Sequence, residues 1–157
     1  MSSGSDARRR VVIGVGNSWQ SDDGAGLAVA QRLRELVPDG VEVLELEGEP
    51  VTLVEAWAGA HEAYVVDAVS SGAMPGTVHR VDAADAPLPR ELSTASTHLF
   101  GIGESVELAR SLGRLPERLV VYGIEAAQIS AGRELSPEAL AGVEEAARRL
   151  LEELDRG

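Results

Sequence analysis

Four side chains in this 157-residue sequence are of types that can bind a metal ion or move a proton. Asp22 and Asp23 are adjacent and follow the loop GVGNSWQS, Asp67 follows the apolar run AYVV, and His98 ends the segment STH ahead of a helical pattern. Carboxylates and an imidazole form a mixed oxygen and nitrogen donor set, which suits borderline divalent ions such as nickel or zinc. These residues lie far apart in the sequence, so only the fold can bring them together.

Each of these residues also has a simpler structural interpretation. Acids in the first turn of a helix stabilise it by about 0.3–1 kcal/mol, and Ser21 or Asp22 suits the N-cap position. Asp67 is costly to bury without partners, so loop amides at 70–72 are expected to bind it unless it faces a functional edge. His98 near the positive end of a helix stays neutral, the form that ligates metals, but a histidine there also caps or packs.

The elements that must position these side chains alternate along the chain. Short valine-rich runs predict strands at Val11–Val15, Val41–Leu46, Ala63–Val69 and Leu119–Tyr122, with Thr77–Val81 added at an edge. Helical patterns follow the first strand as far as Pro38 and cover Val51–Ala58 and Leu99–Leu112. The last helix is predicted to begin with Ser136 as its N-cap and Pro137 as its first residue. This alternation predicts a three-layer α/β/α fold, with a mainly parallel twisted sheet of about five strands and helices on both faces.

Two of the helices show a clear apolar face. The first helix places Gly26, Val29, Ala30, Leu33, Leu36 and Val37 together, and the last places Leu140, Val143, Ala147, Leu150, Leu151 and Leu154 together. Ligands of such folds bind beyond the carboxyl ends of the strands. The loop after the first strand, Asp67 and Glu125 are therefore expected at one edge of the sheet.

Composition limits the partners and the chemistry. The formal net charge is −12, so nucleic acids and anionic membranes are poor partners, and no apolar run is long enough to span a bilayer. We expect a disordered tail at 1–10 and a single domain at 11–157, acting as a cytoplasmic monomer. The chain has neither cysteine nor lysine, which excludes thiolate chemistry, Schiff bases and a P-loop.

Several enzyme classes fit the sequence poorly. A dinucleotide site needs a third glycine where Trp19 stands, and adjacent acids would repel phosphate. A phosphoacceptor receiver domain needs a lysine, and Glu125 stands in that neighbourhood instead. No Gly-x-Ser-x-Gly elbow is present, and His61-Glu62 lacks a second histidine at the zincin spacing. We interpret His61 and His79 as surface residues.

The sequence resembles the hydrogenase maturation proteases, endopeptidases that trim the carboxyl-terminal extension from the large-subunit precursor of nickel-iron hydrogenases. The resemblance extends from about Val11 to Leu154. It rests on Gly14-Val15-Gly16-Asn17 with Ser21-Asp22-Asp23-Gly24-Ala25-Gly26, Val65-Val66-Asp67-Ala68, Pro75-Gly76-Thr77, Ser96-Thr97-His98 with Gly101, and Tyr122-Gly123-Ile124-Glu125.

This resemblance implies that Asp23, Asp67 and His98 bind nickel and carry the catalysis, with nickel supplied by the precursor. Zinc and similar divalent ions are expected to fit the same donors. The resemblance also makes Asn17, Glu47, Glu49 and Glu125 substrate-loop candidates. Glu47-Gly48-Glu49-Pro50 replaces a glycine-glycine-threonine loop found in some relatives.

The implied activity is peptide cleavage by a water molecule that a metal or a carboxylate activates. The alternative function is a non-catalytic protein that binds divalent metal or the nickel-loaded precursor on the same fold. Both functions use the same residues, so the sequence leaves the choice open. A third reading makes the acids helix caps and loop anchors only.

Overall fold

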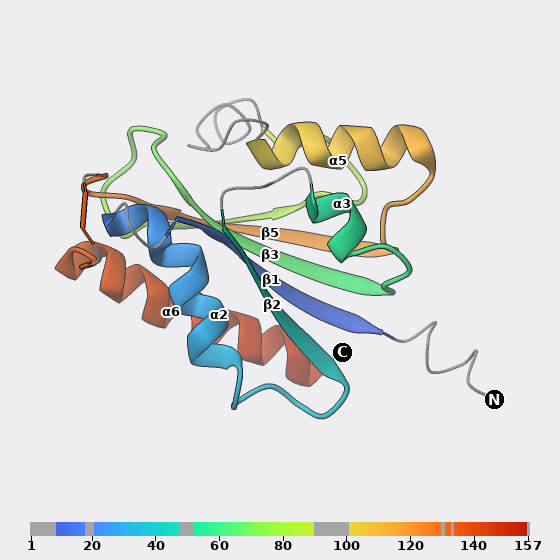
Figure 1. Cartoon of the computed structure of the whole chain (residues 1–157), viewed down its shortest axis with the longest axis horizontal. Coiled ribbons are helices and arrows are strands. Elements are labelled where there is room, and N and C mark those ends of the chain that lie inside the picture. The colour runs from blue at the N-terminus through green and yellow to red at the C-terminus, as the bar shows by residue number, and fades with distance from the viewer. Residues whose placement is uncertain are drawn as a thin grey trace.

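A five-stranded sheet forms the centre of the computed structural model, which describes residues 9–17, 21–47, 52–89, 101–129, 131–132 and 134–156 (Figure 1). The strands are β1 (Arg10–Gly16), β2 (Val41–Glu47), β3 (Glu62–Val69), β4 (Val78–Asp82) and β5 (Arg118–Glu125). They are arranged in the order β2-β1-β3-β5-β4. All neighbours pair in parallel except β4, which pairs antiparallel with β5 at the edge. The predicted mainly parallel sheet with an added edge strand is confirmed.

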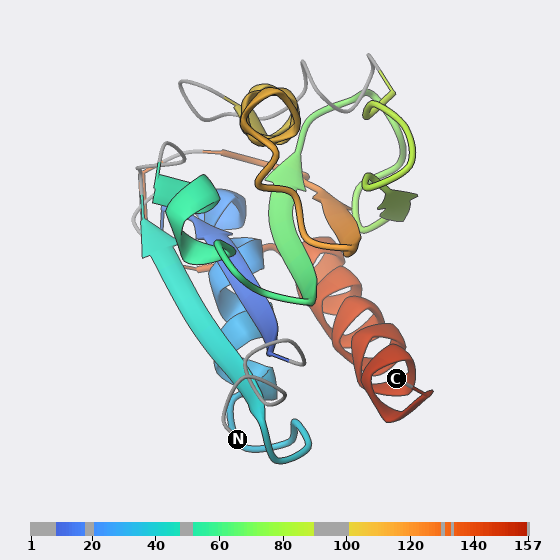
Figure 2. The same cartoon turned by 90° about the vertical axis from the view of Figure 1, so that its right-hand side faces the viewer.

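Helices cover both faces of the sheet, which confirms the three-layer prediction. The helical elements are η1 (Ser21–Gly24), α2 (Ala25–Leu33), α3 (Leu53–Ala56), α5 (Gly101–Leu112) and α6 (Pro137–Arg156). Figure 1 shows α2 and α6 on one side of the sheet and α3 and α5 on the other. In Figure 2, turned by 90°, α5 lies above β3 and β5, and α6 lies below them.

Side chains of the central strands alternate between two apolar cores. In β3, Tyr64 and Val66 join the core under α2 and α6, whereas Ala63 and Val65 join the core under α3 and α5. Because both faces of the strand are covered, its sequence is a nearly continuous apolar run rather than an alternation of apolar and polar residues. The buried Asp67 interrupts this run at its carboxyl end.

Two leucines of the predicted apolar faces are exposed. Leu36 is 56% exposed because α2 ends at Leu33. The last turn of the predicted apolar face therefore lies beyond the end of the helix. Leu140 is 49% exposed in the first turn of α6, although Val143 in the next turn is buried. The pattern was correct for the middle of each helix and wrong at one end.

The predicted tail extends two residues too far. Arg10 is already in β1, and its guanidinium donates to the carbonyl of Leu154 at 2.8 Å. Arg9 donates to the carboxylate of Glu42 and to the carbonyl of Ala58, both at 2.9 Å. Residues 1–8 lie outside the described residues. Among the described residues, none of the helices combines the length and the apolar character that a membrane crossing requires.

Candidate active site

The predicted site residues of the first and third strands lie at one edge of the sheet. Gly14 of β1 pairs with Val66 of β3, so Asp67 lies at the level where β1 ends. Asp23 lies in η1, directly beyond the end of β1. This is the carboxyl edge of the parallel strands, where ligands bind in folds of this type.

Asp67 is buried on the face of the sheet that α3 and α5 cover. Its side chain is 0% exposed, and its Oδ1 accepts a hydrogen bond from the backbone N–H of Ala68 at 2.8 Å. It lies beside a small apolar cavity of about 20 Å³, which Leu88 and Ile102 also line. Ile102 belongs to the first turn of α5, so the beginning of that helix lies close to Asp67.

Asp23 is placed by close backbone packing. The backbone N–H of Asn17 donates to the Asp23 carbonyl at 3.2 Å. A Cβ on Gly16 would lie 2.3 Å from that same carbonyl oxygen, and a Cβ on Gly26 would lie 2.3 Å from the carbonyl oxygen of Val66. These glycines therefore let η1 and α2 approach the strand ends more closely than any side chain permits.

Asp22 is fully buried and does not cap α2. The N-cap of α2 is Gly24, which makes no side-chain hydrogen bond, so the prediction that Ser21 or Asp22 caps this helix is wrong. Asp22 instead accepts hydrogen bonds from the backbone N–H groups of Ala127 and Gln128, at 2.8 and 3.0 Å. It also accepts from the N–H and the hydroxyl of Ser136, both at 2.7 Å. Burial raises the pKa of Asp22, but the hydrogen bonds together lower it by more than burial raises it. The pKa of Asp22 therefore lies below its ordinary value.

Glu125 is a second buried carboxylate at this edge, and it holds the loop after β3. It accepts hydrogen bonds from the N–H and the hydroxyl of Ser71 and from the N–H of Gly72. The backbone amides of Ser71 and Gly72, which we expected to bind Asp67, therefore bind Glu125 instead. His79 Nε2 lies 3.0 Å from Glu125 Oε1, and its side chain is only 23% exposed, so its interpretation as a surface residue is wrong.

The other predicted site residues are only partly described. Asn17 follows β1 and Glu47 ends β2, but the Glu47 side chain lies outside the described part of the structure, as do Glu49 and His98. Within the described ranges, no three histidine, aspartate or glutamate side chains are placed to hold a metal ion. Asp23 and Asp67 both lie at the carboxyl edge of the sheet, and the metal site of Asp23, Asp67 and His98 stays a prediction.

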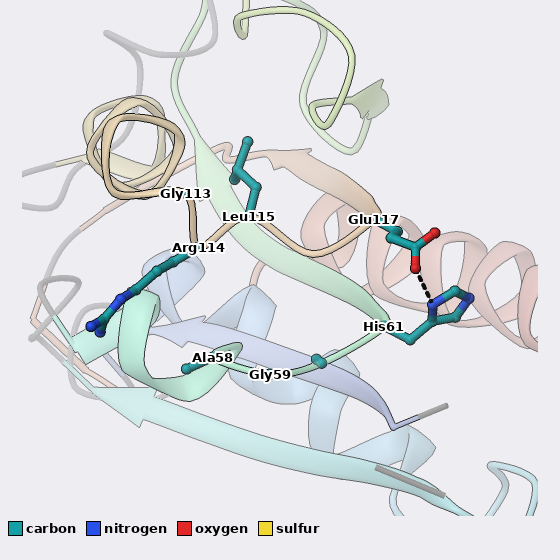
Figure 3. Close-up of a pocket in the computed structure, with 8 residues that line it drawn as sticks. Ala58, Gly59, His61, Gly113, Arg114, Leu115 and Glu117 are labelled. Carbon is teal, nitrogen blue, oxygen red and sulfur yellow. Dashed lines mark ion pairs between the residues drawn. The ribbon is translucent and has the colours of Figure 1, made fainter. Parts of the chain in front are cut away.

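A larger groove lies at the opposite edge of the sheet (Figure 3). It has a volume of about 410 Å³ and lies between the loop before β3 and the loop before β5. His61 lines it and pairs with Glu117 at 3.2 Å, so His61 is a surface residue as predicted. None of the predicted site residues that the structure describes lines this groove, so the carboxyl edge stays the candidate active site.

Comparison with known proteins shows the family of the chain. A model of the hydrogenase maturation protease family matches residues 27–153, which is most of the chain. The chain belongs to the hydrogenase maturation protease family. The matched range includes Asp67 and His98, and it begins just after Asp22 and Asp23.

Individual relatives agree with the family. The chain is 31% identical over 127 residues to a hydrogenase expression/formation protein, HupD, of Bradyrhizobium diazoefficiens, covering 80% of this chain and 66% of that one. It is 27% identical to the hydrogenase 2 maturation protease of Escherichia coli, covering 91% and 88%. The structure of the [NiFe] hydrogenase maturation protease HybD from Thermococcus kodakarensis superposes with a TM-score of 0.71 at 29% identity, covering 93% and 98%. The chain spans 55–66% of the length of three of the curated relatives that it matches.

The roles of Asp22 and His79 were not predicted from sequence. Their partners lie 114 and 46 residues away, and no local pattern reports such contacts. One signal was present: Ser136 was predicted to cap α6, and its hydroxyl does accept from the Ala139 N–H at 3.1 Å. The same hydroxyl donates to Asp22, so the cap also fixes η1.

Proposed function

We propose that this protein is the endopeptidase that removes the carboxyl-terminal extension of a nickel-loaded hydrogenase large-subunit precursor. The observation that carries the proposal is the placement of two buried carboxylates, Asp23 and Asp67, at one sheet edge in a chain of this family. The names of the relatives support the same substrate class. Action as a cytoplasmic monomer stays a prediction.

The chemistry of these residues fits hydrolysis by water. The chain has no cysteine and no nucleophile elbow, so an acyl-enzyme intermediate has no evident nucleophile. A water oxygen attacks the scissile carbonyl carbon while a carboxylate takes its proton, and the carbon–nitrogen bond then breaks as the amine takes a proton. Asp23 or Asp67 is the base in this scheme.

The nickel ion belongs to the precursor in this proposal. Two carboxylates and the imidazole of His98 form the donor set that suits nickel, and zinc fits the same donors. A bound divalent ion supplies positive charge that stabilises the developing oxyanion. Asp23 and Asp67 would thus both recognise the cargo and hold the reacting groups beside it.

The test is cleavage of the matching precursor. The purified protein is incubated with nickel-loaded and nickel-free large-subunit precursor from the same source, and the mass of each is followed. Loss of a short carboxyl-terminal peptide from the loaded form alone is the expected result. Asp23→Asn and Asp67→Asn are expected to abolish it, whereas Glu117→Gln, an exposed carboxylate at the opposite edge, is the matched control. Binding of the precursor without cleavage would instead establish the non-catalytic alternative.

A further inference from the structure

The turn that carries Asp23 is fixed to a part of the chain more than a hundred residues away. The backbone N–H of Ser21 donates to the carbonyl of Gly132 at 2.7 Å, and its hydroxyl donates to the carbonyl of Gln128 at 3.2 Å. Ser21 has a φ of 42°, in the left-handed region that few residues other than glycine adopt. Such a conformation persists only where the surroundings hold it, and these bonds supply that hold.

The carboxylate of Asp22 joins the turn to two structural elements. Its Oδ2 accepts from Ala127 and Gln128, which directly follow β5. Both of its oxygens accept from Ser136, the residue before α6. Four protein donors bind this carboxylate and none of its surface is exposed, so it is not placed to contact a substrate or a metal ion.

Asp23 is held from the other side by β1. The Asn17 N–H donates to its carbonyl oxygen, and the absence of a side chain on Gly16 allows that contact. The backbone at residue 23 is therefore fixed between the end of β1 and the bonds of its neighbour Asp22. A site that must meet a reacting group within a fraction of an ångström needs this kind of support.

We propose that Asp22 is a positioning residue, which fixes the η1 turn so that the Asp23 carboxylate meets the scissile bond and its cargo in the reactive geometry. This inference rests on the proposed function. Asp22 touches no substrate and acts only through Asp23.

The first experiment measures kcat and KM of Asp22→Asn in the full chain. An amide offers one acceptor oxygen, so its NH₂ group opposes at least one of the present donors. We expect kcat to fall about tenfold to a hundredfold with KM changed less than about twofold, since misplacement by about an ångström costs that much. Glu153→Gln is the matched control: it also replaces a carboxylate with several donors, Arg80, Arg118 and Tyr122, and this side chain is only 10% exposed. It lies at the opposite edge, so kcat should be retained.

A second, milder variant keeps the test valid if Asp22→Asn fails to fold. Ser136→Ala keeps the backbone donor to Asp22 and removes only the hydroxyl. A smaller loss of kcat in the same direction is expected, and the double variant should lose less than the product of the single losses. If Asp22→Asn and Ser136→Ala lose no more kcat than Glu153→Gln at equal stability, the inference is overturned.

A readout without substrate separates this inference from the proposed function. Hydrogen exchange of the Asn17 amide reports its bond to the Asp23 carbonyl, a bond in which the Asp22 side chain takes no part. It should exchange at least about tenfold faster in Asp22→Asn and at an unchanged rate in Glu153→Gln. Unchanged exchange in Asp22→Asn would overturn the inference, even if wild type cleaves. Faster exchange in Asp22→Asn, together with a wild type that fails to cleave the precursor, would overturn the proposed function alone.

Discussion

Ser71 donates two hydrogen bonds to the carboxylate of Glu125. Its backbone N–H donates to Oε2 and its hydroxyl donates to Oε1, both at 2.7 Å. The loop between β3 and β4, which begins after Val69, is thus tied to the end of the neighbouring β5. Because Glu125 is only 2% exposed and binds this loop, its role in the structure is to hold the loop in place. The prediction that Glu125 contacts the substrate stays a prediction.

Glu125→Gln should therefore destabilise the protein. The amide cannot accept from Ser71, Gly72 and His79 together, so we expect the free energy of unfolding to fall by about 1–3 kcal/mol. Urea denaturation measures it, with Glu117→Gln as a control because Glu117 also pairs with a histidine but is 81% exposed. The control should change stability by less than about 0.5 kcal/mol. An equal loss of unfolding free energy in both variants would contradict the expectation that the buried Glu125 stabilises the fold more than the exposed Glu117.

Acid should weaken the fold through Glu153. Burial raises the pKa of this carboxyl, but hydrogen bonds from Arg80, Tyr122 and Arg118 outweigh it and lower the pKa from 4.5 to about 2. A lowered pKa means that the stabilisation is complete above the unfolded value of 4.5 and is lost as the pH falls toward 2. The contribution is up to about 3 kcal/mol.

Urea titrations at several pH values test this prediction. The difference in stability between wild type and Glu153→Gln should be largest near pH 6 and shrink as the pH approaches about 3, because protonation removes the same charge. Glu145→Gln serves as the comparison, since Glu145 forms only surface pairs with Arg148 and Arg149. A difference for Glu153→Gln that stays constant with pH would refute the assignment.

Gly26→Ala should be severely destabilising. The added Cβ would lie 2.3 Å from the Val66 carbonyl oxygen and 2.4 Å from that of Val15, and backbone atoms cannot move aside. We expect a loss of about 2–4 kcal/mol, despite the better helix propensity of alanine. In Gly123→Ala the added Cβ would lie 3.2 and 3.3 Å from the Val69 methyl groups and 3.8 Å from the His79 Cβ, all of them side-chain atoms, so this variant should lose less stability in thermal denaturation. The reverse order would contradict the close approach of α2.

Removing either candidate ligand should weaken nickel binding. Asp23→Asn and Asp67→Asn each replace a charged oxygen donor by a neutral one, so we expect at least about a tenfold higher Kd by calorimetry. Glu117→Gln should bind as wild type does. Equal affinities in all four proteins would remove the metal-site hypothesis and leave the acids as structural groups.

The sequence by itself determined the layers, the strands and the approximate edge of the site. Valine-rich runs such as Val11–Val15 and caps such as Ser136-Pro137 are local signals, because burial on both faces and helix initiation constrain neighbouring residues directly. The rule that ligands bind at the carboxyl ends of parallel strands then placed Asp23 and Asp67 together.

Only the tertiary structure decided how the polar residues at that edge are used. Asp22 and Asp23 are adjacent and chemically identical, yet Asp22 is saturated by donors 105 to 114 residues away, whereas Asp23 is placed by β1. Likewise, the loop amides that local reasoning gave to Asp67 bind Glu125. Buried carboxylates take whichever donors the fold brings within 3 Å, because leaving either partner without a hydrogen bond costs more than about 1 kcal/mol. That choice depends on strand register and helix docking, which no local pattern of residues contains.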